Sequence, residues 1–98
     1  MNMSLLGYYH AIEESSRMML DAAKSEDWEG VVRYESSCAV LIEQLRYCAK
    51  SEVLDPVSRQ EKAHIMRRIL RNDAQIRYLA EPWLAHCELG FENRPMLH

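Results

Sequence analysis

The sequence has few of the turn-forming residues that separate the strands of a β-rich fold, because its 98 residues include only three glycines and three prolines. So few breakers cannot supply the frequent turns of an all-β protein. The three cysteines are an odd number without paired metal-ligand spacing. No apolar run approaches the roughly 20 residues of a transmembrane helix, and the first residues do not resemble a signal peptide. We therefore expect a cytoplasmic protein with free thiols and no membrane insertion.

The composition is that of one globular domain spanning residues 1–98, with 48% apolar and 28% charged residues. The net charge of −3 is unevenly distributed. Residues 1–55 hold five basic and ten acidic side chains, whereas residues 56–98 hold seven basic and five acidic ones. A basic helix that binds nucleic acid is one reading, but the acidic whole argues against direct nucleic-acid binding. We favour acidic helices one and two lying against a basic helix three.

The apolar spacing predicts an antiparallel pair of helices in the first half of the chain. The first runs from about residue 5 to residue 24 with Ser4 as its N-cap, and Ser16 completes an apolar seam. The residues of that seam alternate by three and four positions: Leu5, Tyr9, Ile12, Met19 and Ala23. A turn at Ser25 supplies a new N-cap, and the second helix follows over roughly 26–50. The short connection predicts a helical hairpin.

A long third helix is predicted after Asp55, which reads as an N-cap followed by Pro56 at the first helical position. Pro82 removes a backbone donor, so we expect a kink or a break there before helical spacing resumes as far as Gly90. The remaining tail, Phe91 to His98, is too short for another packed helix. The fold class is therefore all-α, a three-helix bundle-like arrangement with one uncovered groove. A fourth helix or a homodimer would cover that groove.

No enzyme motif stands out, and we predict neither a cofactor nor a metal. The sequence has no glycine-rich phosphate loop and no His-Glu-x-x-His motif, and its four histidines are scattered. A small all-helical mutase, of the chorismate mutase type, is the alternative function. Its anion site would draw on Arg17, Arg46, Arg67, Arg71, Glu35 and Asp73. Most of these arginines flank the apolar seam, where charged heads are usually solvated, so we favour a protein that is not an enzyme.

At the third helix the chain resembles the FliT family of flagellar type III export chaperones. The resemblance rests on the pattern Ile69-Leu70-x-x-Asp73-Ala74-x-Ile76-Arg77-x-Leu79-x-x-Pro82, after a helix that carries Ile65. It is supported by Asp27-Trp28 at the start of the second helix and by Val32, Glu35 and Leu41-Ile42 along it. Together these segments span about residues 8–89.

The resemblance implies a chaperone that binds the C-terminal segment of the filament-cap protein FliD and prevents its premature assembly. It also implies contacts with the export ATPase complex and the export gate, and in some members with the regulator FlhDC. Candidate partner-binding residues on the third helix are Ile65, Ile69, Leu70, Asp73, Ile76, Arg77 and Leu79. Longer members carry a further C-terminal helix that modulates binding, whereas this sequence has only Phe91 to His98 after Gly90.

Several of these residues have two readings. Asp73 either accepts a hydrogen bond from an incoming peptide or pairs with Arg77 four residues later. Ile76 and Leu79 either line a binding groove or pack in the core against the first two helices. A third helix that serves both surfaces must be apolar over more than one stripe.

Overall fold

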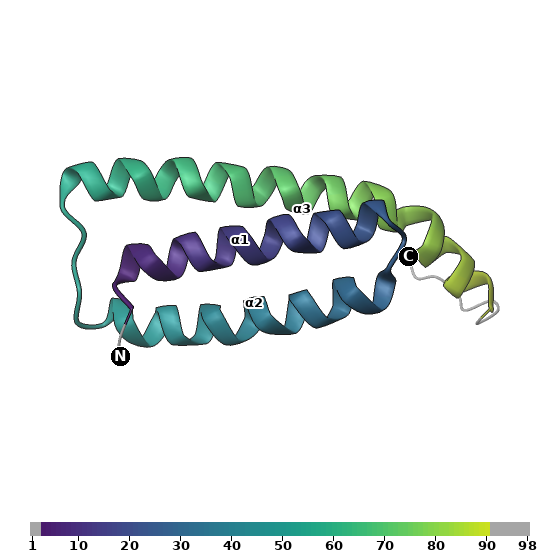
Figure 1. The fold of residues 1–98 in the computed structure, drawn as a ribbon, viewed down its shortest axis with the longest axis horizontal. Helices are drawn as coiled ribbons and strands as arrows, with labels where there is room; N and C mark the ends of the chain where they lie inside the picture. Colours follow the sequence, from purple (N-terminus) through teal and green to yellow (C-terminus); the bar gives the residue numbers. More distant parts are fainter. Residues whose placement is uncertain (1–2, 91–98) are drawn as a thin grey trace.

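The computed structural model describes residues 3–90 and places the side chains of residues 3–82. It contains three helices, α1 (Leu5–Lys24), α2 (Trp28–Ala49) and α3 (Pro56–Gly90), with no strand in the described range. Figure 1 shows α1 lying between the other two, with α2 running antiparallel to both. The predicted all-α fold, a helical hairpin plus a long third helix, is confirmed.

Two of the predicted helix starts are confirmed by their hydrogen bonds. The hydroxyl of Ser4 accepts from the backbone N–H of Gly7 at 3.0 Å, which caps α1. The carboxylate of Asp55 accepts from the backbone N–H of Ser58 at 2.7 Å, and Pro56 is the first residue of α3. Each cap satisfies a backbone donor that the first turn of a helix leaves without a partner.

The predicted start of the second helix is wrong by two residues. Ser25 ends α1 rather than capping α2, because its N–H bonds back to carbonyl groups of the last α1 turn. Glu26 has a φ of 60°, in the left-handed region, which stops α1 and reverses the chain. Asp27 is the N-cap of α2, where its carboxylate accepts from the N–H of Gly30 at 3.0 Å. The helix therefore begins at Trp28.

The core lies on both sides of α1, the central helix. Its fully buried apolar side chains among the described residues are Leu5, Ile12, Leu20 and Ala23 from α1, with Ile65 and Ile76 from α3. Leu20 was missing from the predicted seam, which had Met19 in its place. Met19 is only partly buried beside the cluster formed by Leu20, Ala23 and Ile76. The buried residues of α1 recur at intervals of three, four and seven, so they form one stripe along the helix, as predicted, but with Leu20 on it in place of Met19.

Ser16 is the polar member of this core, and its hydrogen bonds are satisfied. Its hydroxyl donates to the carbonyl oxygen of Glu13 at 2.8 Å and accepts from the side-chain amide of Asn72 at 3.0 Å. The predicted place of Ser16 in the α1 seam is therefore confirmed, and the bond to Asn72 ties α1 to α3.

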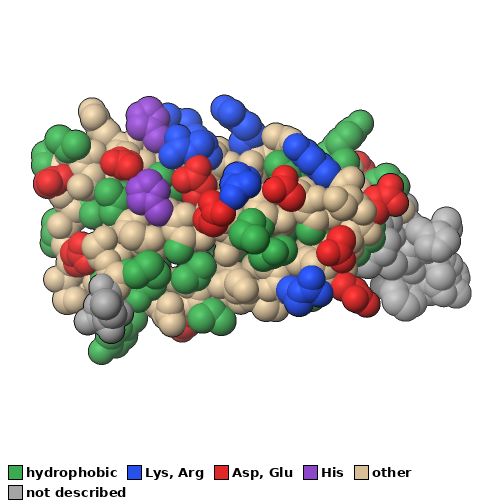
Figure 2. Space-filling view, in the orientation of Figure 1, with side chains coloured by type: hydrophobic (Ala, Val, Ile, Leu, Met, Phe, Trp, Pro, Cys, Tyr) green, Lys and Arg blue, Asp and Glu red, His purple; other side chains and the backbone are tan. Residues whose placement is uncertain are grey.

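Acidic and basic side chains meet where α1 packs against α3, as expected. Arg68 forms an ion pair with Glu13, and His10 lies 3.1 Å from a carboxylate oxygen of Glu61. Figure 2 shows basic side chains over α3 beside acidic ones on this face of the molecule. The expectation that acidic and basic helices meet is thus confirmed for α1.

The same expectation is wrong for α2. Helix α1 packs against both other helices, but α2 and α3 make no close backbone approach to each other in the described range. Gly30 is the only fully buried residue of α2. The three helices therefore form an open layer with α1 in the middle, and the facing sides of α2 and α3 remain uncovered.

Pro82 bends α3 without ending it. Of the two outcomes expected there, a kink or a break, the structure shows no break, since the helix continues through Pro82 to Gly90. Figure 1 shows the final yellow-green part of α3 slanting away from the line of the earlier turns, which agrees with the predicted bend. A proline inside a helix removes one ladder hydrogen bond and crowds the preceding turn, which is a common cause of kinks. The expectation for the tail, residues 91–98, lies outside the described residues.

Candidate functional site

A groove of about 650 Å³ runs between α2 and α3 with α1 as its floor. Side chains from all three helices line it, and most of them are apolar. The floor is formed by Ile12, Ser16 and Met19. The α2 wall is formed by Trp28, Val31, Val32, Glu35, Cys38, Ala39 and Ile42. The α3 wall is formed by Ile69, Leu70, Asp73, Ile76, Arg77 and Ala80. We call this surface the α2–α3 groove.

Both walls follow the helical repeat, since their residues recur at intervals of three and four and so share one face of each helix. Along α2 the lining residues span positions 28–42, and along α3 they span positions 69–80. At 1.5 Å per residue the groove is about 20 Å long, enough for three to four turns of a bound helix.

The groove leaves large apolar side chains in contact with solvent. Leu70 on the α3 wall is 61% exposed, and Val32 on the α2 wall is 53% exposed. Together with Ile42 they form an apolar patch beside α3, which confirms the expectation that three helices leave such a patch uncovered. An apolar patch of this kind is typical of a surface that binds another chain.

The structure brings five of the seven candidate residues into the groove and places two elsewhere. Ile69, Leu70, Asp73, Ile76 and Arg77 line it, as the α3 spacing suggested.

Ile65 and Leu79 do not line the groove. The side chain of Ile65 is completely buried, and that of Leu79 packs against the core cluster of Leu20, Ala23 and Ile76. The structure therefore places both of these residues in the core. Ile76 has both roles, because it is 7% exposed within that cluster and also lines the groove.

Asp73 and Arg77 form an ion pair on the α3 wall, with a carboxylate oxygen and the guanidinium Nε 2.9 Å apart. Both side chains remain substantially exposed, so the pair contributes little to stability, on the order of 0–1 kcal/mol. In the protein without a bound partner, Asp73 therefore pairs with Arg77, which is one of the two roles expected for it. Both side chains still face the groove.

The α2 wall is the part of the site that sequence reasoning missed. It contains none of the candidate partner-binding residues named from the sequence. Its apolar residues are in part buried against the rest of the molecule, since Trp28 and Val31 pack on the core cluster of Leu20, Ala23 and Ile76. The signal that could have found it is Glu35, a charged residue in the middle of an apolar stripe. A charge in that position indicates a stripe that stays in contact with water.

The described side chains offer no catalytic arrangement in the groove. Burial is the main cause of the raised pKa of the Cys38 thiol, so the thiol stays protonated at neutral pH and serves as a small apolar side chain. No group of three or more His, Cys, Asp or Glu side chains within the described part is placed to hold a metal ion.

The arginines considered for a mutase do not meet in the groove. Arg17 is paired with acids of its own helix, and neither Arg46, Arg67 nor Arg71 lines the groove. Among the described lining residues Arg77 is the only arginine, and it is paired with Asp73. A site for a dianionic substrate needs several convergent cations, and this geometry does not supply them.

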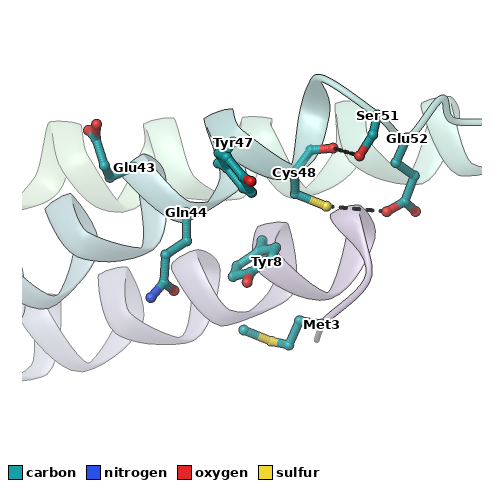
Figure 3. A pocket seen from close by; sticks show the side chains of 8 residues that line it. All are labelled: Met3, Tyr8, Glu43, Gln44, Tyr47, Cys48, Ser51 and Glu52. Carbon is teal, nitrogen blue, oxygen red and sulfur yellow. Dashed lines mark hydrogen bonds between the residues drawn. The ribbon is translucent and has the colours of Figure 1, made fainter. Parts of the chain in front are cut away.

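A second pocket of about 510 Å³ lies at the other end of the helical hairpin (Figure 3). Tyr8 from α1 lies close to Tyr47 from α2 at its centre. The thiol of Cys48 donates to Glu52 at 3.3 Å, and the same carboxylate oxygen accepts from the backbone N–H of Leu5 at 3.0 Å. Glu52 thereby ties the end of α2 to the start of α1. None of the candidate partner-binding residues lines this pocket.

Comparison with protein families gave a match to the family model described as "Flagellar protein FliT", over residues 6–89. Neither the curated proteins nor the solved structures gave a match to this sequence. Within the described residues no helix combines the length and the apolar character needed to span a bilayer. The matched residues contain the whole of the α2–α3 groove and most of the three helices. The chain belongs to the FliT family of flagellar export chaperones.

Proposed function

We propose that this protein is the cytoplasmic chaperone of the filament-cap protein FliD and that it holds the C-terminal segment of FliD in the α2–α3 groove. By covering that segment it prevents premature assembly, and it delivers the client to the type III export apparatus through the ATPase complex and the export gate. The proposal extends to restraint of flagellar gene expression through the regulator FlhDC.

The observation that carries the proposal is the apolar α2–α3 groove on an open three-helix layer. Its walls come from two helices whose backbones make no close approach to each other in the described range, and α1 closes its floor. An amphipathic helix laid into such a groove buries its own apolar face together with the exposed side chains of Val32 and Leu70. Burial of apolar surface is the main favourable term in association of this kind.

Two valines of α2 provide a matched test. Val32 is 53% exposed and lines the groove, whereas Val40 is 57% exposed on the same helix and does not. Val32→Asp places a carboxylate where the client would bury it, so we expect its affinity for a FliD C-terminal fragment to fall at least about tenfold. Val40→Asp introduces the same charge away from the groove and should bind like the unmodified protein. Isothermal titration calorimetry measures both affinities.

Far-UV circular dichroism of the two variants checks that each retains its helices, since both valines are exposed in the free chain. Equal losses of affinity in folded Val32→Asp and Val40→Asp would place the binding site elsewhere. Absence of any binding between the unmodified chain and the FliD fragment would refute the proposed client.

A further inference from the structure

Glu35 is a charged residue in the middle of the apolar α2 wall. It lies seven residues, or two helical turns, from both Trp28 and Ile42, which mark the two ends of that wall. Its nearest neighbours on the same face of the helix are apolar, since they are Val31, Val32, Cys38 and Ala39. A carboxylate therefore occupies the centre of a surface that is otherwise suited to an apolar partner.

The carboxylate of Glu35 has no ion-pair or hydrogen-bond partner among the side chains that the structure describes. Three charged residues line the groove, and the other two, Asp73 and Arg77, are paired with each other on the opposite wall. Its negative charge is one of the causes of the raised pKa of Cys38, which lies one turn further along the same wall. The groove thus carries one unpaired negative charge, on its α2 side and near its midpoint.

A partner that covers Glu35 with apolar atoms would strip water from this carboxylate without replacing the lost hydrogen bonds. Removing an ionised group from water without a compensating partner is strongly unfavourable. A lysine or arginine on the partner would offset that cost with a charge-assisted hydrogen bond. The same residue therefore favours a basic partner segment and disfavours a purely apolar one.

From this we infer that Glu35 selects and positions the client by pairing with one basic side chain near the middle of the apolar face of its bound helix. This inference rests on the proposed function, because it assumes that the α2–α3 groove is where the client docks. The occupant is an amphipathic helix of three to four turns, about 13 residues for a groove about 20 Å long. Its basic residue faces α2, and its apolar residues contact the floor and both walls. The pair fixes the register of the client along the groove.

A double-mutant cycle tests the pairing. The probe is a synthetic peptide of the FliD C-terminal segment, together with variants in which each lysine or arginine is replaced in turn by glutamine. Glu35→Gln should weaken binding of the unmodified peptide by about tenfold, because a hydrogen bond to a charged group usually contributes about that factor to an affinity. One of the glutamine-substituted peptides should bind the unmodified protein about tenfold more weakly as well. The affinity of that peptide for Glu35→Gln should be little lower still.

Glu43→Gln is the matched control, because Glu43 is an exposed acid of the same helix that lies outside the groove. It should leave the affinity unchanged. The affinity of the unmodified protein should also fall with added salt more steeply than that of Glu35→Gln. A further peptide with glutamate in place of that basic residue should bind the unmodified protein poorly, and Glu35→Arg should restore its binding.

The outcomes separate this inference from the proposed function. If Val32→Asp abolishes binding but Glu35→Gln binds every peptide as the unmodified protein does, the client uses the groove and the inference is wrong. If Glu35→Gln changes the free energy of unfolding but not the affinity, Glu35 acts within the chain, for example on Arg77, and the inference is again wrong. If the peptide does not bind the unmodified protein, both the inference and the proposed function fail.

Discussion

Ile76 belongs to two surfaces at once. It is buried with Leu20 and Ala23 on one side, and it lines the α2–α3 groove on the other. A charge at this position would therefore unfold the core as well as disturb the groove, so Ile76→Asp cannot separate the two roles. Leu70, six residues earlier on the same helix, is 61% exposed and offers a cleaner probe of the groove.

Ile65 and Leu70 should respond to truncation in opposite ways. Ile65 is fully buried, so Ile65→Ala leaves a cavity and should lower the free energy of unfolding by about 2–5 kcal/mol. Leu70→Ala should change it by less than about 1 kcal/mol, because an exposed side chain loses little burial. Urea denaturation followed by circular dichroism measures both. Equal destabilisation by the two variants would contradict the division of α3 into a core stripe and a groove stripe.

At the scale of the helices, the N-caps could be predicted from the sequence with the most accuracy. Ser4 and the pair Asp55-Pro56 have side chains that suit these positions whatever the tertiary structure, and both helices begin where expected. The start of α2 differs from the prediction because Ser25 and Asp27, two residues apart, both suit an N-cap position. Only the left-handed conformation of Glu26 decides that Asp27 is the cap.

Asp55 makes the stability of α3 depend on pH. The hydrogen bond from the backbone N–H of Ser58 is the main cause of a pKa below the ordinary 3.8. The stabilising effect of the charged cap is therefore fully present above that ordinary value and is lost as the pH falls through the lower pKa of the folded state. Asp55→Asn keeps a cap acceptor but does not titrate in this range.

We expect the unmodified protein to lose stability relative to Asp55→Asn as the pH falls from 5 to about 2. The difference between the two proteins should stay constant between pH 5 and pH 7. Urea denaturation at each pH provides the measurement. Parallel curves for the two proteins down to pH 2 would show that this carboxylate is not stabilised by α3.

The division of each helix into core and groove faces could not be read from the sequence. Leu20 and Met19 are adjacent apolar residues, and only the packing of α1 against two helices decides that Leu20 is buried. On α2, Trp28 and Val31 pack on the core cluster and also line the groove, so one apolar stripe contributes to both surfaces. Periodicity identifies an apolar face, but it does not tell whether another part of the same chain covers that face.

Within the described residues the molecule is an open layer in which the α1 backbone approaches both neighbours, whereas the α2 backbone approaches only that of α1. Helix α2 fully buries only Gly30, so few interactions oppose its local opening. We expect the backbone amides of α2 to exchange with solvent faster than those of α1 in the free protein. Hydrogen exchange followed by mass spectrometry measures this difference. Equal protection of α1 and α2 would show that α2 is held more firmly than its burial indicates.

We propose above that the C-terminal segment of FliD docks in the α2–α3 groove. Site-specific photocrosslinking tests it most directly, with a photoreactive amino acid placed in turn at Val32 and Leu70 in the groove and at Val40 outside it. Mass spectrometry of the crosslinked products identifies the segment of FliD that lies against each position. We predict crosslinks from positions 32 and 70 to the C-terminal segment of FliD and none from position 40. Crosslinks from position 40 with none from positions 32 and 70 would show that FliD docks on another surface.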